Sequence, residues 1–203
     1  MRNIIDSHLH LNGWGKADFI DCFESYRNDK KLKAINICAI PIEQTNICNN
    51  IMVGFYKLAH PSTYAHAGLE LIAIPLSENM PSGMDTVSQY RELMEIGFDG
   101  MKMLEGKPSE HKRIGKSLNH PELNRFYKEL ERDGTHLLMH VNDPDEFWDE
   151  KTAPDWAKEN GWAYLDGSFA GFEEIKSQAI KILEEHPSIR LTLAHFFFSS
   201  KTP

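Results

Sequence analysis

Short apolar runs alternate along the chain with longer segments of helical periodicity. The apolar runs predict six strands, at residues 3–11, 33–40, 64–75, 98–104, 135–141 and 189–196. The segments between them predict helices near residues 17–30, 45–59, 84–96, 121–133 and 171–186. Strands that alternate with helices form βαβ units, in which the strands are parallel. The pattern therefore predicts an α/β fold built on one parallel sheet.

The number of these units is the main anomaly. A TIM-type (β/α)8 barrel has eight strands and about 250 residues, whereas this 203-residue chain holds about six βα units, the last without its helix. Either two further units are missing from the sequence, or the sheet is open. We favour an incomplete barrel that forms one domain over residues 1–203, because no terminal helix covers the last strand. Unpaired sheet edges would make a six-stranded chain prone to aggregation and weak in catalysis.

Histidines stand at the carboxyl ends of three predicted strands. His8 and His10 end the first apolar run, His140 ends the fifth and His195 ends the sixth. Alternate residues of a strand share a face, so we expect His8 and His10 to point the same way, with Asp6 one pleat deeper. In a parallel barrel the carboxyl ends of the strands meet on the face that holds the active site. Each histidine alone fits an ordinary strand end, but together they predict a metal or catalytic cluster.

Composition narrows the class of protein. Hydrophobic residues make up 41% and charged residues 26% of the chain, which is ordinary for a globular domain. The net charge of -8 argues against binding to nucleic acid or to an acidic membrane surface. No apolar stretch of the sequence reaches the roughly 18 residues of a membrane span. Cys22, Cys38 and Cys48 are odd in number and fit no C-x-x-C pattern, so we expect reduced thiols in a cytoplasmic protein.

The histidine pattern and three further stretches resemble the amidohydrolase superfamily of metal-dependent barrels, over essentially the whole chain. The stretches are Gly97-Phe98-Asp99-Gly100-Met101-Lys102-Met103, His140-Val141-Asn142-Asp143-Pro144 and Leu193-Ala194-His195-Phe196. They are similar to the branch called amidohydrolase-2, which includes metal-dependent decarboxylases and lactone hydrolases.

This resemblance implies that His8, His10 and His140 hold a divalent metal. In similar proteins the sixth-strand histidine binds a second metal, or contacts the substrate when one metal is present. With one metal, His195 would be the catalytic residue that orients the substrate or polarises the reacting group. In similar proteins an aspartate after the eighth strand completes the site, and this sequence ends before that position. Neutral imidazoles suit Zn²⁺, with Mn²⁺ or Fe²⁺ as alternatives. Bound zinc lowers the pKa of water towards about 7, and it can also polarise a carboxylate.

Lys102 is a candidate for contact with the substrate. It lies in the fourth predicted strand, where a buried ammonium group needs partners. In some relatives a lysine at about this place is carboxylated and bridges two metals, and in relatives with one metal it is absent or contacts the substrate. We favour substrate contact. The alternative is a lysine whose ammonium group extends to the rim of the barrel.

Two loops supply the other substrate-binding candidates. Arg113 belongs to a basic cluster after the fourth strand, which would attract an anionic substrate unless it is only a solvated loop. The other members of this cluster are Lys107, His111, Lys112 and Lys116. Trp148 belongs to the long aromatic loop at residues 142–168. Such a loop is either a lid over the site or a satellite hydrophobic cluster.

We interpret the sequence as that of a metal-dependent hydrolase, which acts on a small, carboxylate-bearing substrate through a metal-activated water. A metal-dependent decarboxylase of the same family is the alternative. Two further interpretations stay open: a TatD-like phosphodiesterase or deoxyribonuclease, in which Glu105 would be a bridging ligand, and a non-catalytic metal- or ligand-binding barrel. We expect a small-molecule substrate, no nucleic acid and no membrane as partners, and we leave a homo-oligomer open.

Overall fold

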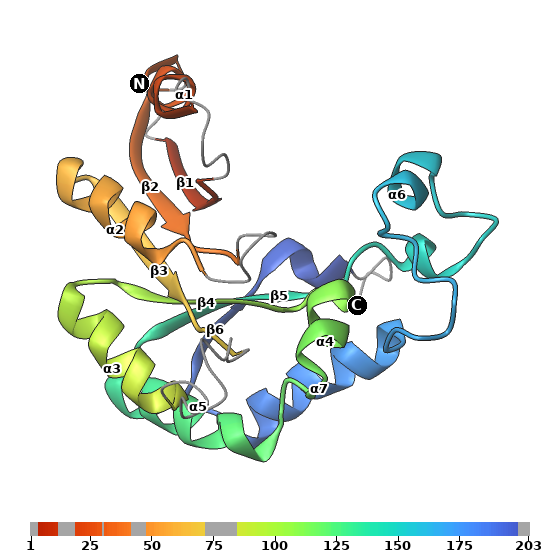
Figure 1. Ribbon diagram of the computed structural model, residues 1–203. Coiled ribbons are helices and arrows are strands. Elements are labelled where there is room, and N and C mark those ends of the chain that lie inside the picture. Colours follow the sequence, from red (N-terminus) through yellow and green to blue (C-terminus); the bar gives the residue numbers. More distant parts are fainter. Residues whose placement is uncertain (1–3, 12–18, 30, 42–47, 72–84, 199–203) are drawn as a thin grey trace, which may run out of the picture.

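The computed structural model describes residues 4–11, 19–29, 31–41, 48–71 and 85–198 (Figure 1). The strands are β1 (Ile4–Leu9), β2 (Leu32–Cys38), β3 (Thr63–Gly68), β4 (Gly100–Gly106), β5 (His136–Val141) and β6 (Arg190–Leu193). The helices are α1 (Phe19–Asp29), α2 (Asn50–Ala59), α3 (Thr86–Ile96), α4 (Pro108–Ile114), α5 (Pro121–Asp133), α6 (Asp155–Glu159) and α7 (Phe172–Glu185). Two short 3-10 segments are η1 (Asp145–Trp148) and η2 (Ala194–Phe198).

The six strands form one sheet in the order in which they occur along the chain, and all five neighbouring pairs are parallel. Crossovers between parallel strands are right-handed almost without exception, so crossovers that all advance in one direction place their helices on one face. A doubly wound sheet instead reverses direction and carries helices on both faces. This sheet, with its six described strands, curls with the helices outside, as the wall of a TIM-type barrel does (Figure 1).

The helix-covered face of the sheet is apolar. Alternate residues of the strands pack against α2, α3, α5 and α7 in a single core. Its buried members include Ile35, Ile37, Met101, Met103, Leu137 and Met139 from the strands and Val53, Phe126, Leu130 and Ile175 from the helices. Each buried side chain of this size stabilises the fold by about 1.5–3 kcal/mol. The alternation therefore fixes which residues of each strand face the helices and which face the concave side.

The concave face carries a chain of polar side chains. The amide oxygen of Asn36 on β2 lies 2.7 Å from Nδ1 of His66 on β3, and Nε2 of His66 lies 2.7 Å from Nδ1 of His136 on β5. Nε2 of His136 lies 2.8 Å from the hydroxyl oxygen of Thr192 on β6. Because an amide oxygen only accepts hydrogen bonds, His66 donates from Nδ1. Nε2 of His66 then accepts from Nδ1 of His136, and Nε2 of His136 accepts from the hydroxyl of Thr192. The chain ties four strands together across the inside of the curl.

Gly100 on β4 leaves room for this chain. It lies between His66 and His136 in the register of the sheet. A Cβ atom on Gly100 would lie 2.6 Å from Nε2 of His66 and 2.7 Å from the carbonyl oxygen of His136. Since the second neighbour is backbone, an added methyl group cannot be accommodated by a side-chain rotation alone.

We expect Gly100→Ala to lower the free energy of unfolding by about 1–3 kcal/mol, because the overpacked core must displace His66 or β5. The matched control is Gly54→Ala in α2, where the new Cβ would meet the ring of Phe98 at an ordinary 3.5 Å. Replacing this helical glycine should stabilise the protein by about 0.5–1 kcal/mol. Urea unfolding measures both variants, and equal effects would contradict the role assigned to Gly100.

The hydrogen-bonded row of side chains from Asn36 to Thr192 predicts that the stability of the protein is sensitive to acid. Burial, followed by the neighbouring His136, lowers the pKa of His66 from 6.5 to about 4. Between these values the unfolded chain binds a proton that the folded protein does not. Stability is therefore fully present above pH 6.5 and falls as the pH drops towards 4. The titration of His66 alone should lower the free energy of unfolding by on the order of 3 kcal/mol over this range. Urea unfolding at pH 7 and at about pH 5 measures the loss, and a loss that persists undiminished in His66→Gln would contradict this origin.

The structure differs from the sequence predictions in four segments. The third strand ends at Gly68, and residues 69–71 are not part of it. The polar loop after the fourth strand contains helix α4, which begins at Pro108 and ends at Gly115, a left-handed residue with φ of 63°. The aromatic loop contains η1 and α6. The last strand ends at Leu193, because the chain then turns into η2. Residues 72–75 of the third predicted strand lie outside the described residues.

Both ends of one predicted helix are confirmed. Helix α5 begins at Pro121 and stops at Gly134, whose φ is 64°. The thiols of Cys38 and Cys48 are free and buried. None of the helices in the described ranges has the length and apolar character needed to span a bilayer.

Candidate active site

The carboxyl end of β1 supplies two histidines to the concave side, His8 within the strand and His10 just after it. The ring centroids of His8 and His10 lie 4.8 Å apart, and Nδ1 of His10 lies 2.8 Å from the carbonyl oxygen of Cys38 on β2. The pairing of β1 with β2 shifts register after Asp6, as at a β-bulge. Asp6 therefore differs from expectation: its carboxylate accepts a hydrogen bond from the hydroxyl of Tyr26 on α1, at 3.2 Å.

His195 lies between the histidines of the first and fifth strands. Its ring centroid is 5.2 Å from that of His8 and 5.2 Å from that of His140. His140 belongs to β5, and His195 follows β6 within η2. The fold thus brings together the four histidines that the sequence analysis selected.

A left-handed turn follows β6. The four residues from His195 to Phe198 have φ between 43° and 56°, a conformation that costs non-glycine residues about 1–2 kcal/mol each. The turn also brings the ring of Phe198 to 5.8 Å from His140 and 5.0 Å from His195. Strained backbone of this kind persists where the surroundings hold it, often at functional sites.

The four imidazoles are neutral at pH 7. Burial lowers the pKa of His8 to about 3 and that of His10 to about 4, and the ammonium group of Lys102 lowers both. Burial and Lys102 also lower the pKa values of His140 and His195. A neutral imidazole keeps a lone pair for a metal or a proton. Nε2 of His8 is buried without a hydrogen-bond partner among the described residues, so it is an unused ligand atom.

Lys102 is a buried cation close to this cluster. Its residue is 2% exposed, and Nζ has no hydrogen-bond partner in the part of the chain that the structure describes. The adjacent Met101 and Met103 face the helix-covered core, so Lys102 lies on the concave side. Burial lowers its pKa from 10.5 to about 8, which still leaves the ammonium group largely charged at pH 7. A buried charge without a partner is costly, and a bound anion would relieve that cost.

Asp143 connects His140 to the neighbouring loop. Its Oδ1 lies 3.2 Å from Nε2 of His140, and its Oδ2 accepts from Nζ of Lys107 at 2.6 Å and from the hydroxyl of Tyr164. Burial opposes ionisation of this carboxyl, but the hydrogen bonds from His140 and Lys107 outweigh it, so the pKa of Asp143 is lowered. The sequence analysis gave Asp143 no role. The sequence signal that could have linked it to the site is its position three residues after His140.

We expect Asp143→Ala to lower the free energy of unfolding by about 3–5 kcal/mol, because Lys107 would remain largely buried without its partner. The double variant Lys107→Met/Asp143→Leu should recover most of this loss, since no unpaired charge remains. The control is Glu185→Ala, which breaks an exposed pair with Lys181 and should cost less than about 1 kcal/mol. Urea unfolding measures all three. A small effect of Asp143→Ala, equal to that of the control, would contradict the buried network.

The aromatic loop forms a small cluster of its own. Phe147, Ala157 and Tyr164 are buried together, and Trp148 and Phe169 pack against them. Nε1 of Trp148 donates to the carbonyl oxygen of Ala170 at 3.2 Å. In Figure 1 helix α6, within this loop, stands to one side of the sheet. This arrangement agrees with the satellite cluster that the sequence left as one alternative.

The basic side chains after β4 all have partners. The pairs are Lys107 with Asp143, His111 with Gln178, Lys112 with Ser168, Arg113 with Glu110 and Lys116 with Glu122. The structure places Arg113 in α4, with Nε 2.7 Å from the Glu110 carboxylate. Burial raises the pKa of nearby Glu105 to about 7, against the charges of Lys102 and Arg113.

The chemistry of the histidine cluster fits a divalent metal. Three neutral imidazoles, one with an unpaired buried nitrogen, are ligands that Zn²⁺ prefers. The rings are not grouped around one point: within the described residues, no three His, Cys, Asp or Glu side chains converge as metal ligands. Metal binding would therefore require the rings to reorient, with Nε2 of His140 kept on Asp143 and Nδ1 left for the metal.

Several solved structures share this fold. An uncharacterised TIM-barrel protein, Bb4693 from Bordetella bronchiseptica, matches with a TM-score of 0.57 and 12% identity, over 95% of this chain and 66% of that one. The 2,6-dihydroxybenzoate decarboxylase from Rhizobium matches with a TM-score of 0.56 and 16% identity, over 98% of this chain and 68% of that one. The 4-oxalomesaconate hydratase from Rhodopseudomonas palustris matches with a TM-score of 0.55 and 12% identity, over 94% of this chain and 62% of that one.

These similarities establish the fold class. The chain spans about two thirds of the length of the structures that it matches. The curled parallel sheet is therefore similar to part of a TIM barrel. No protein-family model matches the sequence, and no curated protein matches it.

Proposed function

We propose that this protein is a metal-dependent hydrolase of the amidohydrolase type, which acts on a small carboxylate-bearing substrate. The observation that carries the proposal is the meeting of four neutral histidines from β1, β5 and the turn after β6. They lie at the carboxyl ends of parallel strands, the edge at which barrel enzymes hold their active sites.

In this proposal His8, His10 and His140 hold the metal, with Zn²⁺ preferred and Mn²⁺ or Fe²⁺ as alternatives. When bound, such a metal supplies Lewis acidity and lowers the pKa of water. Asp143 holds the imidazole of His140 through Nε2. A metal-ligating histidine usually has such a carboxylate or carbonyl partner.

Two charged or basic groups would act on the substrate. The ammonium group of Lys102, buried and unpaired, binds the carboxylate of the substrate. His195, neutral because burial lowers its pKa, accepts a proton at a ring nitrogen and returns it to the leaving group. The ring of Phe198 packs beside His195, with the ring centroids 5.0 Å apart.

Decarboxylation is the second candidate. A bound carboxylate beside a Lewis acid is the substrate of a decarboxylase as well as of a hydrolase. The structural likeness to 2,6-dihydroxybenzoate decarboxylase supports this alternative, at 16% identity. A substrate panel that contains both lactones and aromatic carboxylic acids separates the two reactions.

The proposal predicts that the purified chain binds about one equivalent of zinc per protein. His8→Ala and His140→Ala should each lose most of this metal, because each removes one of three imidazole ligands. His120→Ala is the matched control, since this histidine caps helix α5 and should leave the metal content unchanged. Metal analysis after dialysis measures all four proteins. Equal metal content in His140→Ala and the control would contradict the proposed ligand set.

His195→Ala should keep its metal and lower kcat far more than it changes KM, because His195 acts in the transition state. Lys102→Met should instead raise KM for carboxylate substrates. Steady-state kinetics on the substrate panel with added zinc tests both. Tight zinc binding without turnover of any member would favour the non-catalytic metal-binding barrel.

A further inference from the structure

Helix α2 is apolar on two sides. Val53 and Tyr56 are buried against the sheet, as expected for a barrel helix. Its outward residues are apolar too: Ile51 is 72%, Phe55 69% and Leu58 78% exposed. A surface helix of a globular protein normally carries polar residues on its outer face, and a helix that is apolar all round is normally covered.

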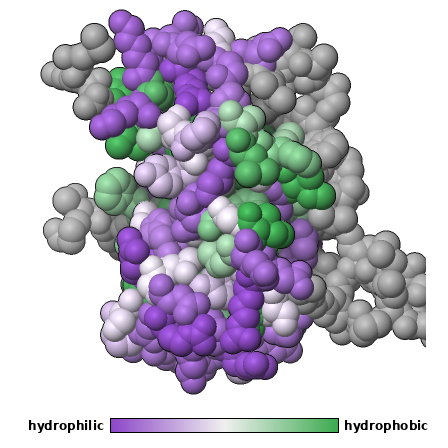
Figure 2. Space-filling view, turned by 90° about the vertical axis from the view of Figure 1, so that its left-hand side faces the viewer, coloured by the Kyte–Doolittle hydropathy of each residue, from purple (hydrophilic) through white to green (hydrophobic). Residues whose placement is uncertain are grey.

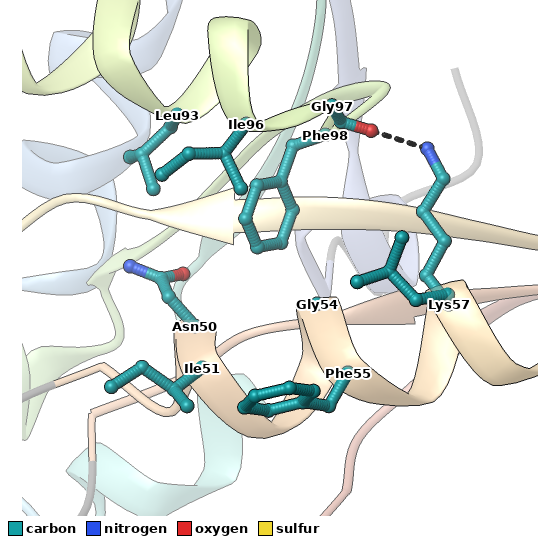
Figure 3. Close-up of a pocket in the computed structure, with 10 residues that line it drawn as sticks. Asn50, Ile51, Gly54, Phe55, Lys57, Leu93, Ile96, Gly97 and Phe98 are labelled. Carbon is teal, nitrogen blue, oxygen red and sulfur yellow. Dashed lines mark hydrogen bonds between the residues drawn. The ribbon is translucent and has the colours of Figure 1, made fainter.

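The outer face of α2 continues into a groove. The groove lies between α2 and α3 and has a volume of about 420 Å³. Its walls include Ile51 and Phe55 from α2 and Ile96 from α3, which is 69% exposed. Figure 3 shows the ring of Phe98 pointing across the groove towards Gly54 on α2, and a Cβ atom on Gly54 would lie 3.5 Å from this ring. Figure 2 shows apolar patches gathered on this side of the molecule, among hydrophilic surroundings.

The polar groups at the ends of the groove are already bonded. The side-chain amide of Asn50 donates to the carbonyl oxygen of Gly68 and accepts from its amide nitrogen, both at 2.9 Å. The ammonium group of Lys57 donates to the carbonyl oxygen of Gly97 and to Asp99, the latter at 2.7 Å. These groups are therefore committed within the chain. The groove suits apolar side chains better than a polar small molecule.

We propose that this face, defined by Ile51, Phe55, Leu58 and Ile96, is the interface of a two-fold homodimer. The four side chains present roughly 500 Å² of apolar surface, at the upper end for a monomer. This is about two thirds of the ~800 Å² per partner that a stable interface of standard size buries. The face also carries both a projection and a recess: the exposed ring of Phe55 lies beside the groove between α2 and α3. In a two-fold contact each Phe55 can enter the groove of the other copy.

The charges on this face are compatible with a contact between two copies. Each copy has a net charge of -8, so two copies repel at long range, and a contact surface without net charge adds no further repulsion. The charged residue lining the groove, Lys57, is neutralised by Asp99 at 2.7 Å. An uncharged apolar contact between two acidic copies is the arrangement that these observations predict.

Sedimentation equilibrium of the full chain tests the proposal. The wild type should be a dimer. Phe55→Glu, which places a carboxylate in the contact of each copy, should weaken association at least about 100-fold, the effect of two buried unpaired charges. The matched control is Ile180→Glu, on the exposed face of α7, where Ile180 is 43% exposed. This variant should dimerise as the wild type does. Circular dichroism confirms that each variant is folded, and Phe55→Ser replaces Phe55→Glu if it is not.

Hydrogen exchange supplies an independent readout. The amides of α2 from Ile51 to Leu58 should exchange more slowly as the protein concentration rises, while those of α7 should not change. A monomer at every concentration, or a dimer that Phe55→Glu leaves intact, would overturn the proposal. A monomer whose groove binds an apolar dye would also overturn it, because the occupant would then be a small ligand.

Discussion

The placement of all the major helices on one face of the sheet is the constraint on which the rest of the structure depends. It follows from six strands that run in sequence order through right-handed crossovers. The helix-covered face must then be apolar, while the other face can hold polar side chains inside the curl. Histidines, a lysine and an asparagine occupy that second face at alternate strand positions. The same alternation that builds the core thus assigns these groups to one concave surface.

Within that surface the site depends on charge as much as on position. Lys102 is buried with no partner for its ammonium group among the described residues. Its charge, added to burial, keeps the nearby imidazoles neutral. Asp143 and Lys107 form a second, internally paired unit that fixes His140 from the loop side. The site therefore combines the unpaired ammonium group of Lys102, which can bind an anion, with neutral imidazole nitrogens, which can bind a metal or a proton.

Much of this could be predicted from the sequence. The parallel α/β pattern, the limits of α5 and the meeting of His8, His10, His140 and His195 all follow from periodicity and from the rule that strand ends converge. Asp6 could not be placed, because a register shift in β1 turns it towards Tyr26, and pleat counting assumes an unbroken strand. The hydrogen-bonded row of side chains from Asn36 to Thr192 could not be predicted either, because it joins four strands that are far apart in the sequence. Helix α4 was read as a loop, because its composition is strongly charged.

The central claim is that histidines from β1 and β5 can share one metal ion. X-ray absorption spectroscopy of the zinc-loaded protein tests it directly. The account predicts three imidazole nitrogens at about 2.0–2.1 Å from the zinc, with one fewer in His140→Ala. Failure to bind zinc, or a coordination shell that His140→Ala leaves unchanged, would contradict the account.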